Sequence, residues 1–164
     1  MAISKRLPWS RLPGYIIAQC LGATVASFVV WQLLTGLKIG KTTYDLATHG
    51  VGSNGGVPGV GPITLFGYEV IMTAFFVYVI FTVTRKDAPA GFAPLPIGIF
   101  LFVAHLIGVP LGDSSLNPAR SLGPALVQGG EALNINVLGI FLFAPVIGGI
   151  LGWTMYTMLH EKPE

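Results

Sequence analysis

The sequence predicts an all-α membrane protein, a bundle of about four membrane-spanning helices and one shorter helix within a single domain, residues 1–164. Hydrophobic residues make up 52% of the chain and charged residues only 10%, which lies outside the range of soluble globular domains. Four apolar runs are long enough to cross a hydrocarbon core that requires about 20 residues. A fifth helical segment, about residues 117–127, is too short to cross it.

The first predicted span covers about residues 14–34. Small residues recur in it at four-residue intervals, at Gly14, Ala18, Gly22 and Ala26. Because small residues let another helix approach closely in lipid, we expect this face to pack against one. Gln19 is the one strongly polar residue of the run. We interpret it as an anchor that forms an interhelical hydrogen bond, in preference to a contact with a transported solute.

Residues 35–62 predict a long irregular connection, because hydropathy falls and glycine-rich turn signals appear. Lys38, Lys41 and His49 within it are interpreted as solvated residues. The second predicted span, about residues 63–84, follows.

Glu69 lies near the start of this second span, where a charge is costly and therefore suggests a function. It could accept hydrogen bonds from the backbone N–H groups of an irregular segment, or it could bind or relay an ion. Since no other acidic residue lies inside a predicted span, a proton relay lacks partners. The sequence therefore favours the anchoring role.

The third and fourth predicted spans cover about residues 92–111 and 137–159. Each contains small residues at four-residue intervals, which suit close helix packing. They are Ala104, Gly108 and Gly112 in the third span and Gly148 and Gly152 in the fourth. His105 is next to the first of these stripes. It is expected either to face a lumen or to bond to a neighbouring helix.

Between these spans, Asn117 fits the N-cap of a helix and Pro118 fits its first position. Such a short helix either lies outside the membrane or enters it partway. The flanking spans favour entry, and irregular backbone at membrane depth is tolerated only in protein or along a water-filled cavity. The sequence thus predicts a pore, with the positive end of the helix dipole directed at the lumen.

The basic residues predict the orientation of the chain. One group falls on the side of the termini: Lys5, Arg6, Arg11, Arg85, Lys86 and Lys162. Since only Lys38 and Lys41 fall on the other side, both termini are expected in the cytoplasm. The net charge of +2 gives no indication of a nucleic-acid partner.

The segment Asn117-Pro118-Ala119-Arg120-Ser121 resembles the second Asn-Pro-Ala box of the aquaporin, or major intrinsic protein, family. Further resemblances lie in Gly14-Tyr15-Ile16-Ile17-Ala18-Gln19 (third span), Ala88-Pro89-Ala90-Gly91-Phe92-Ala93-Pro94 (cytoplasmic loop and fifth span) and Pro145-Val146-Ile147-Gly148-Gly149 (sixth span). They cover nearly the whole chain and are closest to bacterial water-selective members. The resemblance implies a passive water channel of the inner (plasma) membrane, with tetramers as the family habit.

The resemblance also implies roles for single residues. It places Asn117, Pro118 and Ala119 at the pore centre, with the Asn117 amide donating to passing water. It identifies Glu69 as the glutamate that holds the loop before the short helix.

The selectivity constriction implied by the resemblance contains His105, Arg120 and the backbone carbonyl of Ser114. The charge of Arg120 and the helix dipole are expected to disfavour cations. A histidine at position 105 is typical of water-selective members, whereas glycerol-conducting relatives usually carry a small residue there. A glycerol or small-solute facilitator is therefore the less favoured alternative.

The chain departs from the family pattern by lacking the first two spans and the first Asn-Pro-Ala box. A pore then requires a companion chain or another source of these elements, and a non-conducting membrane subunit with an assembly role is a further alternative. Water and membrane lipid are the expected partners. No residue set resembles a nucleophile with a base or a metal site, so we predict no enzyme activity and no cofactor.

Overall fold

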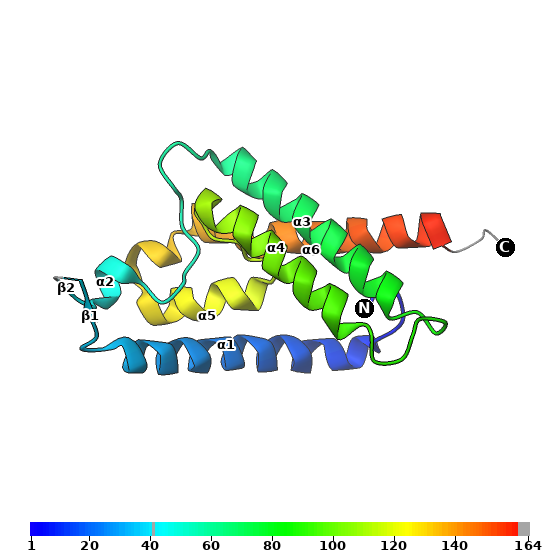
Figure 1. The fold of residues 1–164 in the computed structure, drawn as a ribbon, viewed down its shortest axis with the longest axis horizontal. Coiled ribbons are helices and arrows are strands. Elements are labelled where there is room, and N and C mark those ends of the chain that lie inside the picture. Colours follow the sequence, from blue (N-terminus) through cyan, green and yellow to red (C-terminus); the bar gives the residue numbers. More distant parts are fainter. Residues whose placement is uncertain (41, 161–164) are drawn as a thin grey trace.

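The computed structural model describes residues 1–40 and 42–160. Its elements follow one another along the chain (Figure 1) as η1 (Trp9–Arg11), α1 (Leu12–Leu34), β1 (Lys38–Ile39), β2 (Thr42–Thr43), α2 (Leu46–His49), α3 (Pro62–Val83), α4 (Pro94–Gly112), α5 (Pro118–Gln128), η2 (Gly130–Leu133) and α6 (Ile135–His160). Helices dominate, which confirms the all-α fold class.

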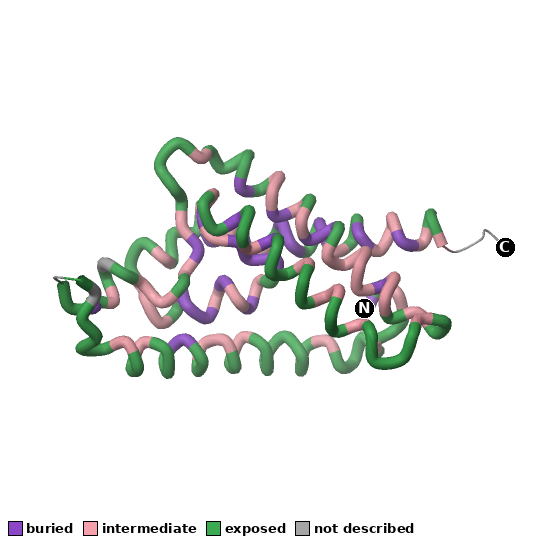
Figure 2. The backbone as a smooth tube through the Cα atoms, viewed as in Figure 1, coloured by how far each residue is buried: buried purple, intermediate pink, exposed green. Residues whose placement is uncertain are grey.

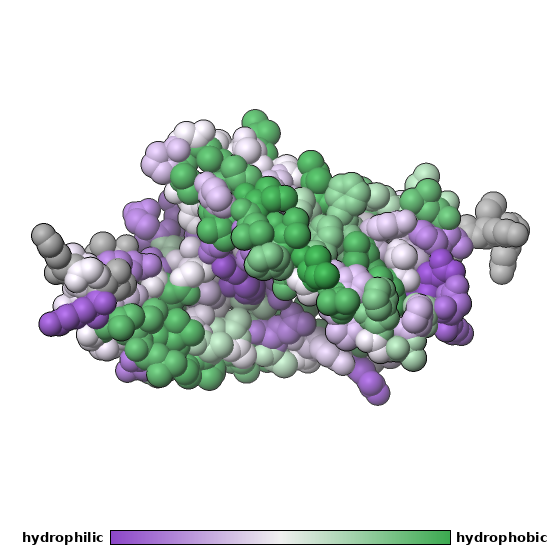
Figure 3. Space-filling view, in the orientation of Figure 1, coloured by the Kyte–Doolittle hydropathy of each residue, from purple (hydrophilic) through white to green (hydrophobic). Residues whose placement is uncertain are grey.

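Four helical segments in the described part are long and apolar enough to cross a membrane: Trp9–Leu34, Pro62–Val83, Pro94–Gly112 and Ile135–His160. Many of their large apolar side chains are exposed, and they form broad hydrophobic areas on the molecular surface (Figure 3). An apolar exterior of this kind suits a lipid environment. The shorter α5 packs against α1 on one side and α6 on the other (Figure 1).

Proline and glycine mark several helix boundaries. Pro62, Pro94 and Pro118 occupy the first turns of α3, α4 and α5, where a missing N–H costs no intrahelical bond. Helix α5 ends before Gly129, which has a φ of 68°, a conformation that glycine adopts without steric cost. The boundaries of α5 are therefore encoded at both ends.

The expected irregular connection after α1 contains more structure than predicted. Strands β1 and β2 pair in antiparallel orientation, and α2 follows them. His49 is exposed, in line with its interpretation as a solvated residue, and its ring also lies 5.6 Å from that of Tyr44, centroid to centroid. Lys41 lies outside the described residues. Hydropathy could not predict β1, β2 and α2, because these elements are too short to produce a periodic pattern.

The small residues of α4 and α6 pack as predicted. The most extensive contact between elements joins α3 and α6, where a Cβ atom on Gly148 would meet Thr73 Cβ at 2.8 Å. In α4, a Cβ atom on Gly112 would lie 2.8 Å from Leu65 Cδ2. These glycines permit close helix approach, the usual basis of packing in lipid.

The stripe on α1 behaves differently: it is not packed within the described chain, so its contact with another helix stays a prediction. All four of its residues are exposed, and Figure 2 shows α1 exposed along most of its length. Helix α1 contacts α5 through a neighbouring face, because Gly123 has no side chain and admits Ala23, with 2.7 Å from a built Cβ to that of Ala23. The buried Ser27 lies on this same face.

Glycine at position 148 gives a prediction about stability. The replacement Gly148→Ala is expected to destabilise the protein by about 1–3 kcal/mol, because the added methyl group overpacks the α3–α6 contact. The measurement is thermal unfolding in detergent. Gly139→Ala in the same helix is the matched control, since nothing lies within 4 Å of its added Cβ. Equal stability of the two variants would show that α3 and α6 separate easily.

Both ends of the described chain lie at the same end of the bundle (Figure 1). Arg6 donates a hydrogen bond to Thr84 Oγ1 at 3.1 Å, and its guanidinium carbon lies 4.4 Å from the centroid of the Phe81 ring. The N-terminal segment is thus fixed to the end of α3. Of the basic residues used to predict orientation, Lys162 lies outside the described residues.

Candidate functional site

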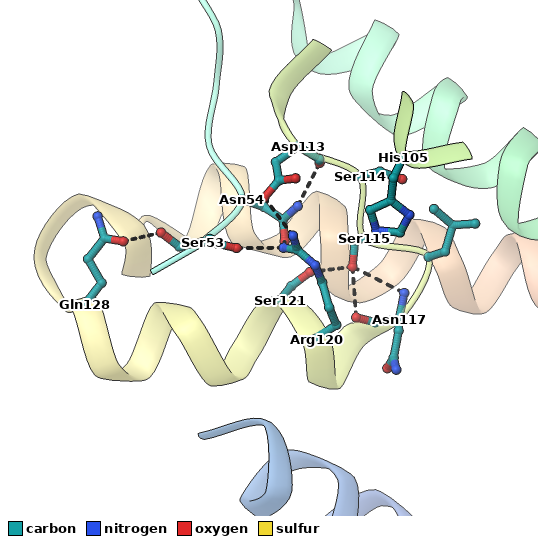
Figure 4. Close-up of polar contacts among 12 residues, drawn as sticks. Ser53, Asn54, His105, Asp113, Ser114, Ser115, Asn117, Arg120, Ser121 and Gln128 are labelled. Carbon is teal, nitrogen blue, oxygen red and sulfur yellow. Dashed lines mark hydrogen bonds and ion pairs between the residues drawn. The ribbon is translucent and has the colours of Figure 1, made fainter. Parts of the chain in front are cut away.

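The start of α5 is built around Asn117. Its Oδ1 accepts a hydrogen bond of 3.0 Å from the backbone N–H of Ala119, which confirms the predicted N-cap. The Asn117 side chain is exposed and, in Figure 4, extends away from the polar cluster towards α1. Among the described residues, its amide nitrogen donates no hydrogen bond. This donor is therefore available to a solute.

The loop that leads into α5 is held from α3. Glu69 is fully buried, and its two carboxylate oxygens accept hydrogen bonds from the backbone N–H groups of Ser115 at 2.7 Å and Leu116 at 2.8 Å. Such charge-assisted bonds satisfy donors that the irregular backbone cannot pair internally. They fix the position of the loop relative to α3.

Serine hydroxyls complete the inner side of this loop. Ser115 Oγ donates to the backbone oxygen of Asn117 at 2.8 Å and also bonds to Ser121 Oγ. Ser114 is buried, and its Oγ lies 3.3 Å from the hydroxyl of Tyr68. No hydrogen bond from the described residues reaches the carbonyl oxygen of Ser114. That carbonyl retains its capacity to accept one.

Arg120 is fixed by acceptors from two other segments (Figure 4). Its Nη1 donates to Gly52 O at 2.8 Å and to Asn54 Oδ1 at 2.9 Å. Its Nη2 forms an ion pair with Asp113 Oδ2 at 2.7 Å. Sequence reasoning assigned no task to these three partners. Asp113 offered the only signal, as an acidic residue seven positions before the arginine.

His105 is half-buried on α4. Its Nδ1 bonds to the backbone oxygen of Leu101 at 2.8 Å. Since a carbonyl oxygen can only accept, Nδ1 must donate and carries the proton. The other ring nitrogen, Nε2, remains for a different partner. The imidazole is thereby held in one orientation.

A cavity of about 430 Å³ lies between α1 and α5. Asn117, Ala119 and Arg120 line it together with Gln19 and Gly22. His105 and Ser114 are not among its lining residues. The cavity thus joins three of the predicted pore and constriction residues but does not include the whole predicted constriction.

The anchoring role expected of Gln19 finds no support in the described part of the chain. Its side chain is exposed and lines the cavity, and no hydrogen bond joins it to a described residue. The physical reason is its position on the open face of α1. In the same described ranges, no group of three or more His, Cys, Asp or Glu side chains could hold a metal ion.

Comparison with known proteins agrees with this architecture. Residues 1–156 match the family described as Major intrinsic protein. The chain is 42% identical to Aquaporin Z of Rhodopseudomonas palustris, in an alignment that covers 99% of this chain and 67% of that relative. It is 40% identical to Aquaporin Z of Bradyrhizobium diazoefficiens, with the same coverage.

Members of this family are membrane channels and not enzymes. The apolar helices, the capped short helix and the buried loop of this chain form a framework of that kind. The sequence match extends through all of them. The chain therefore belongs to the major intrinsic protein family, as a membrane channel of the aquaporin kind.

Proposed function

We propose that this chain conducts water passively, as a subunit or fragment of a water channel, with the start of α5 at the pore centre. The observation that carries this proposal is a cavity that both Asn117 and Arg120 line. Asn117 presents a free amide donor there, and Pro118 and Ala119 form the first turn of α5. The positive end of the α5 dipole at this point disfavours cations.

The outer constriction in this proposal consists of His105, Arg120 and the Ser114 carbonyl. The Ser114 carbonyl, the His105 imidazole and the Arg120 guanidinium supply hydrogen-bonding partners. These replace the partners that a water molecule loses when it enters the pore. Glu69 keeps the loop in place through its bonds to Ser115 and Leu116. No bond in the solute is made or broken.

Osmotic swelling of proteoliposomes in a stopped-flow instrument tests the function. Vesicles that contain the assembled channel are expected to swell faster than empty vesicles. The replacement Asn117→Leu is expected to slow this swelling, because it removes both the helix cap and the hydrogen-bond donor of the pore. Asn136→Leu is a control for an exposed asparagine in another helix. Swelling at the rate of empty vesicles would favour a non-conducting subunit, and equally rapid glycerol entry would favour a solute facilitator.

The proposed partners are membrane lipid and either further copies of this chain in a tetramer or a companion chain that supplies the remaining spans. The small residues exposed on α1 support this, because a second helix could approach them closely and cover the cavity beside Gly22. Native mass spectrometry of the purified particle tests it. A monomer that conducts water would contradict the proposal.

We further propose that both termini face the cytoplasm of a cell whose inner membrane holds the protein. With Cys20→Ser as background, a cysteine introduced by His49→Cys is expected to react with an impermeant maleimide from outside intact cells, whereas Lys86→Cys is expected to react only after lysis. The reason is the excess of basic residues at the end near Arg85. The reverse labelling pattern would contradict this orientation.

A further inference from the structure

The guanidinium group of Arg120 has one charged partner in the described part of the chain, and that partner is Asp113. The ion pair, 2.7 Å from Nη2 to Oδ2, joins the first turn of α5 to the first residue of the loop between α4 and α5. The other two acceptors, Gly52 O and Asn54 Oδ1, are neutral and come from the loop after α2. Arg120 is therefore held on one side by a charge and on the other by neutral oxygens.

The carboxylate of Asp113 is itself well positioned. Asp113 is the residue that directly follows α4, and its backbone N–H donates to Val109 O at 3.2 Å. Its backbone oxygen accepts a hydrogen bond of 2.7 Å from Asn54 Nδ2, and Asn54 is only 5% exposed. The same buried amide thus contacts both members of the ion pair and fixes their separation.

We propose that Asp113 is a positioning and charge-setting residue: its carboxylate holds the Arg120 guanidinium against the loop of residues 52–54 and cancels its charge at the pore mouth. This inference rests on the proposed function only for its effect on solutes. Without the carboxylate, the guanidinium keeps only its two neutral acceptors and is held less firmly beside the cavity that it lines.

The pairing also changes the electrostatics expected of the constriction. The guanidinium of Arg120 alone carries a charge of +1, whereas the Arg120–Asp113 pair carries none. The nearest buried acid, Glu69, bonds to two backbone N–H groups of the loop, and His105 bonds to Leu101. The exclusion of cations then depends on the dipole of α5. Loss of the Asp113 charge would leave Arg120 unpaired and would favour the passage of anions.

The position of Arg120 can be tested without any conduction, by its rate of modification with phenylglyoxal in the purified full chain, followed by peptide mass spectrometry. Asp113→Asn is expected to raise the rate at Arg120 by about 3- to 5-fold, the size typical of a partly exposed ion pair. Asp113→Glu, which keeps the charge, is expected to remain nearer the rate of the unaltered chain. Equal rates for all three proteins would overturn the proposal.

Two controls accompany this experiment. Asp87→Asn removes the partner of Arg85 at another site and should leave the rate at Arg120 unchanged. In the unaltered protein, about 1 M salt screens ion pairs and should speed modification of Arg120 more than that of Arg6, which bonds to the neutral Thr84. If salt affects both arginines equally, the ion pair does not hold Arg120.

Chloride flux in proteoliposomes tests the charge. In an assembly that conducts water, Asp113→Asn is expected to raise chloride permeability about 3-fold or more, with no rise for Asp87→Asn. Unchanged chloride permeability in a water-conducting Asp113→Asn assembly would overturn this part of the proposal. If the unaltered protein conducts no water, the proposed function fails, while the phenylglyoxal rates still decide whether Asp113 holds Arg120.

Discussion

The replacement Glu69→Leu is expected to destabilise the protein by at least about 2 kcal/mol. The carboxylate is fully buried and accepts bonds from two backbone N–H groups, those of Ser115 and Leu116. Leucine has no acceptor, and an unpaired buried donor costs about 1–3 kcal/mol. The loop before α5 should then lose its fixed conformation, which thermal unfolding in detergent and proteolysis near residue 115 would measure.

A milder loss is expected for Glu69→Gln. The amide oxygen of glutamine can still accept one of the two bonds, but its NH₂ group would oppose the second N–H. Glu131→Leu, at an exposed acid on η2, provides the control and should have little effect. An equal loss of stability in Glu69→Leu and Glu69→Gln would instead indicate a role that depends on the negative charge of Glu69.

The replacement His105→Gly is expected to change solute selectivity. It removes a half-buried imidazole that the Leu101 carbonyl holds in one orientation, so the proposed constriction widens and loses a polar wall. Glycerol permeability of the conducting assembly should rise on the order of tenfold, which corresponds to a barrier lower by about 1.4 kcal/mol. Water permeability should persist.

Stopped-flow swelling and shrinking assays on matched vesicles measure both solutes. His49→Gly is the control, since this histidine lies in α2 on the loop before α3 and should leave both permeabilities unchanged. If the unaltered assembly passes glycerol as readily as water, His105 is not part of a selectivity constriction. If neither version passes water, the non-conducting alternative gains support.

The boundaries of several elements could be read from local chemistry. Pro118 and Asn117 marked the start of α5, and the observed cap bond to Ala119 follows directly from their adjacency. The stripes in α4 and α6 also predicted close packing. The identical pattern in α1 does not say which helix packs there, because spacing shows that a face can be packed closely but not which helix occupies it. In this structure α1 presents Ala23 to Gly123 instead.

In the candidate site, too, the sequence identified some residues, whereas their partners became known only from the structure. Glu69 could be singled out because a charge within an apolar run is costly, and Arg120 because it belongs to the segment that resembles the Asn-Pro-Ala box. Their partners could not be found this way. Asn54 and Arg120 are 66 positions apart in the chain, and Asn54 and Asp113 are 59 apart, so no local pattern relates them.

The sequence by itself determined the membrane class, the four long helices, the family and the capped short helix, because hydropathy and helix caps depend on residues within a few turns of one another. Only the tertiary structure decided that the loop of residues 52–54 reaches Arg120, that Asp113 forms an ion pair with it, and that no helix of the described chain covers the stripe of α1. These outcomes depend on contacts between distant segments, and such contacts form only where several helices pack together and exclude other arrangements.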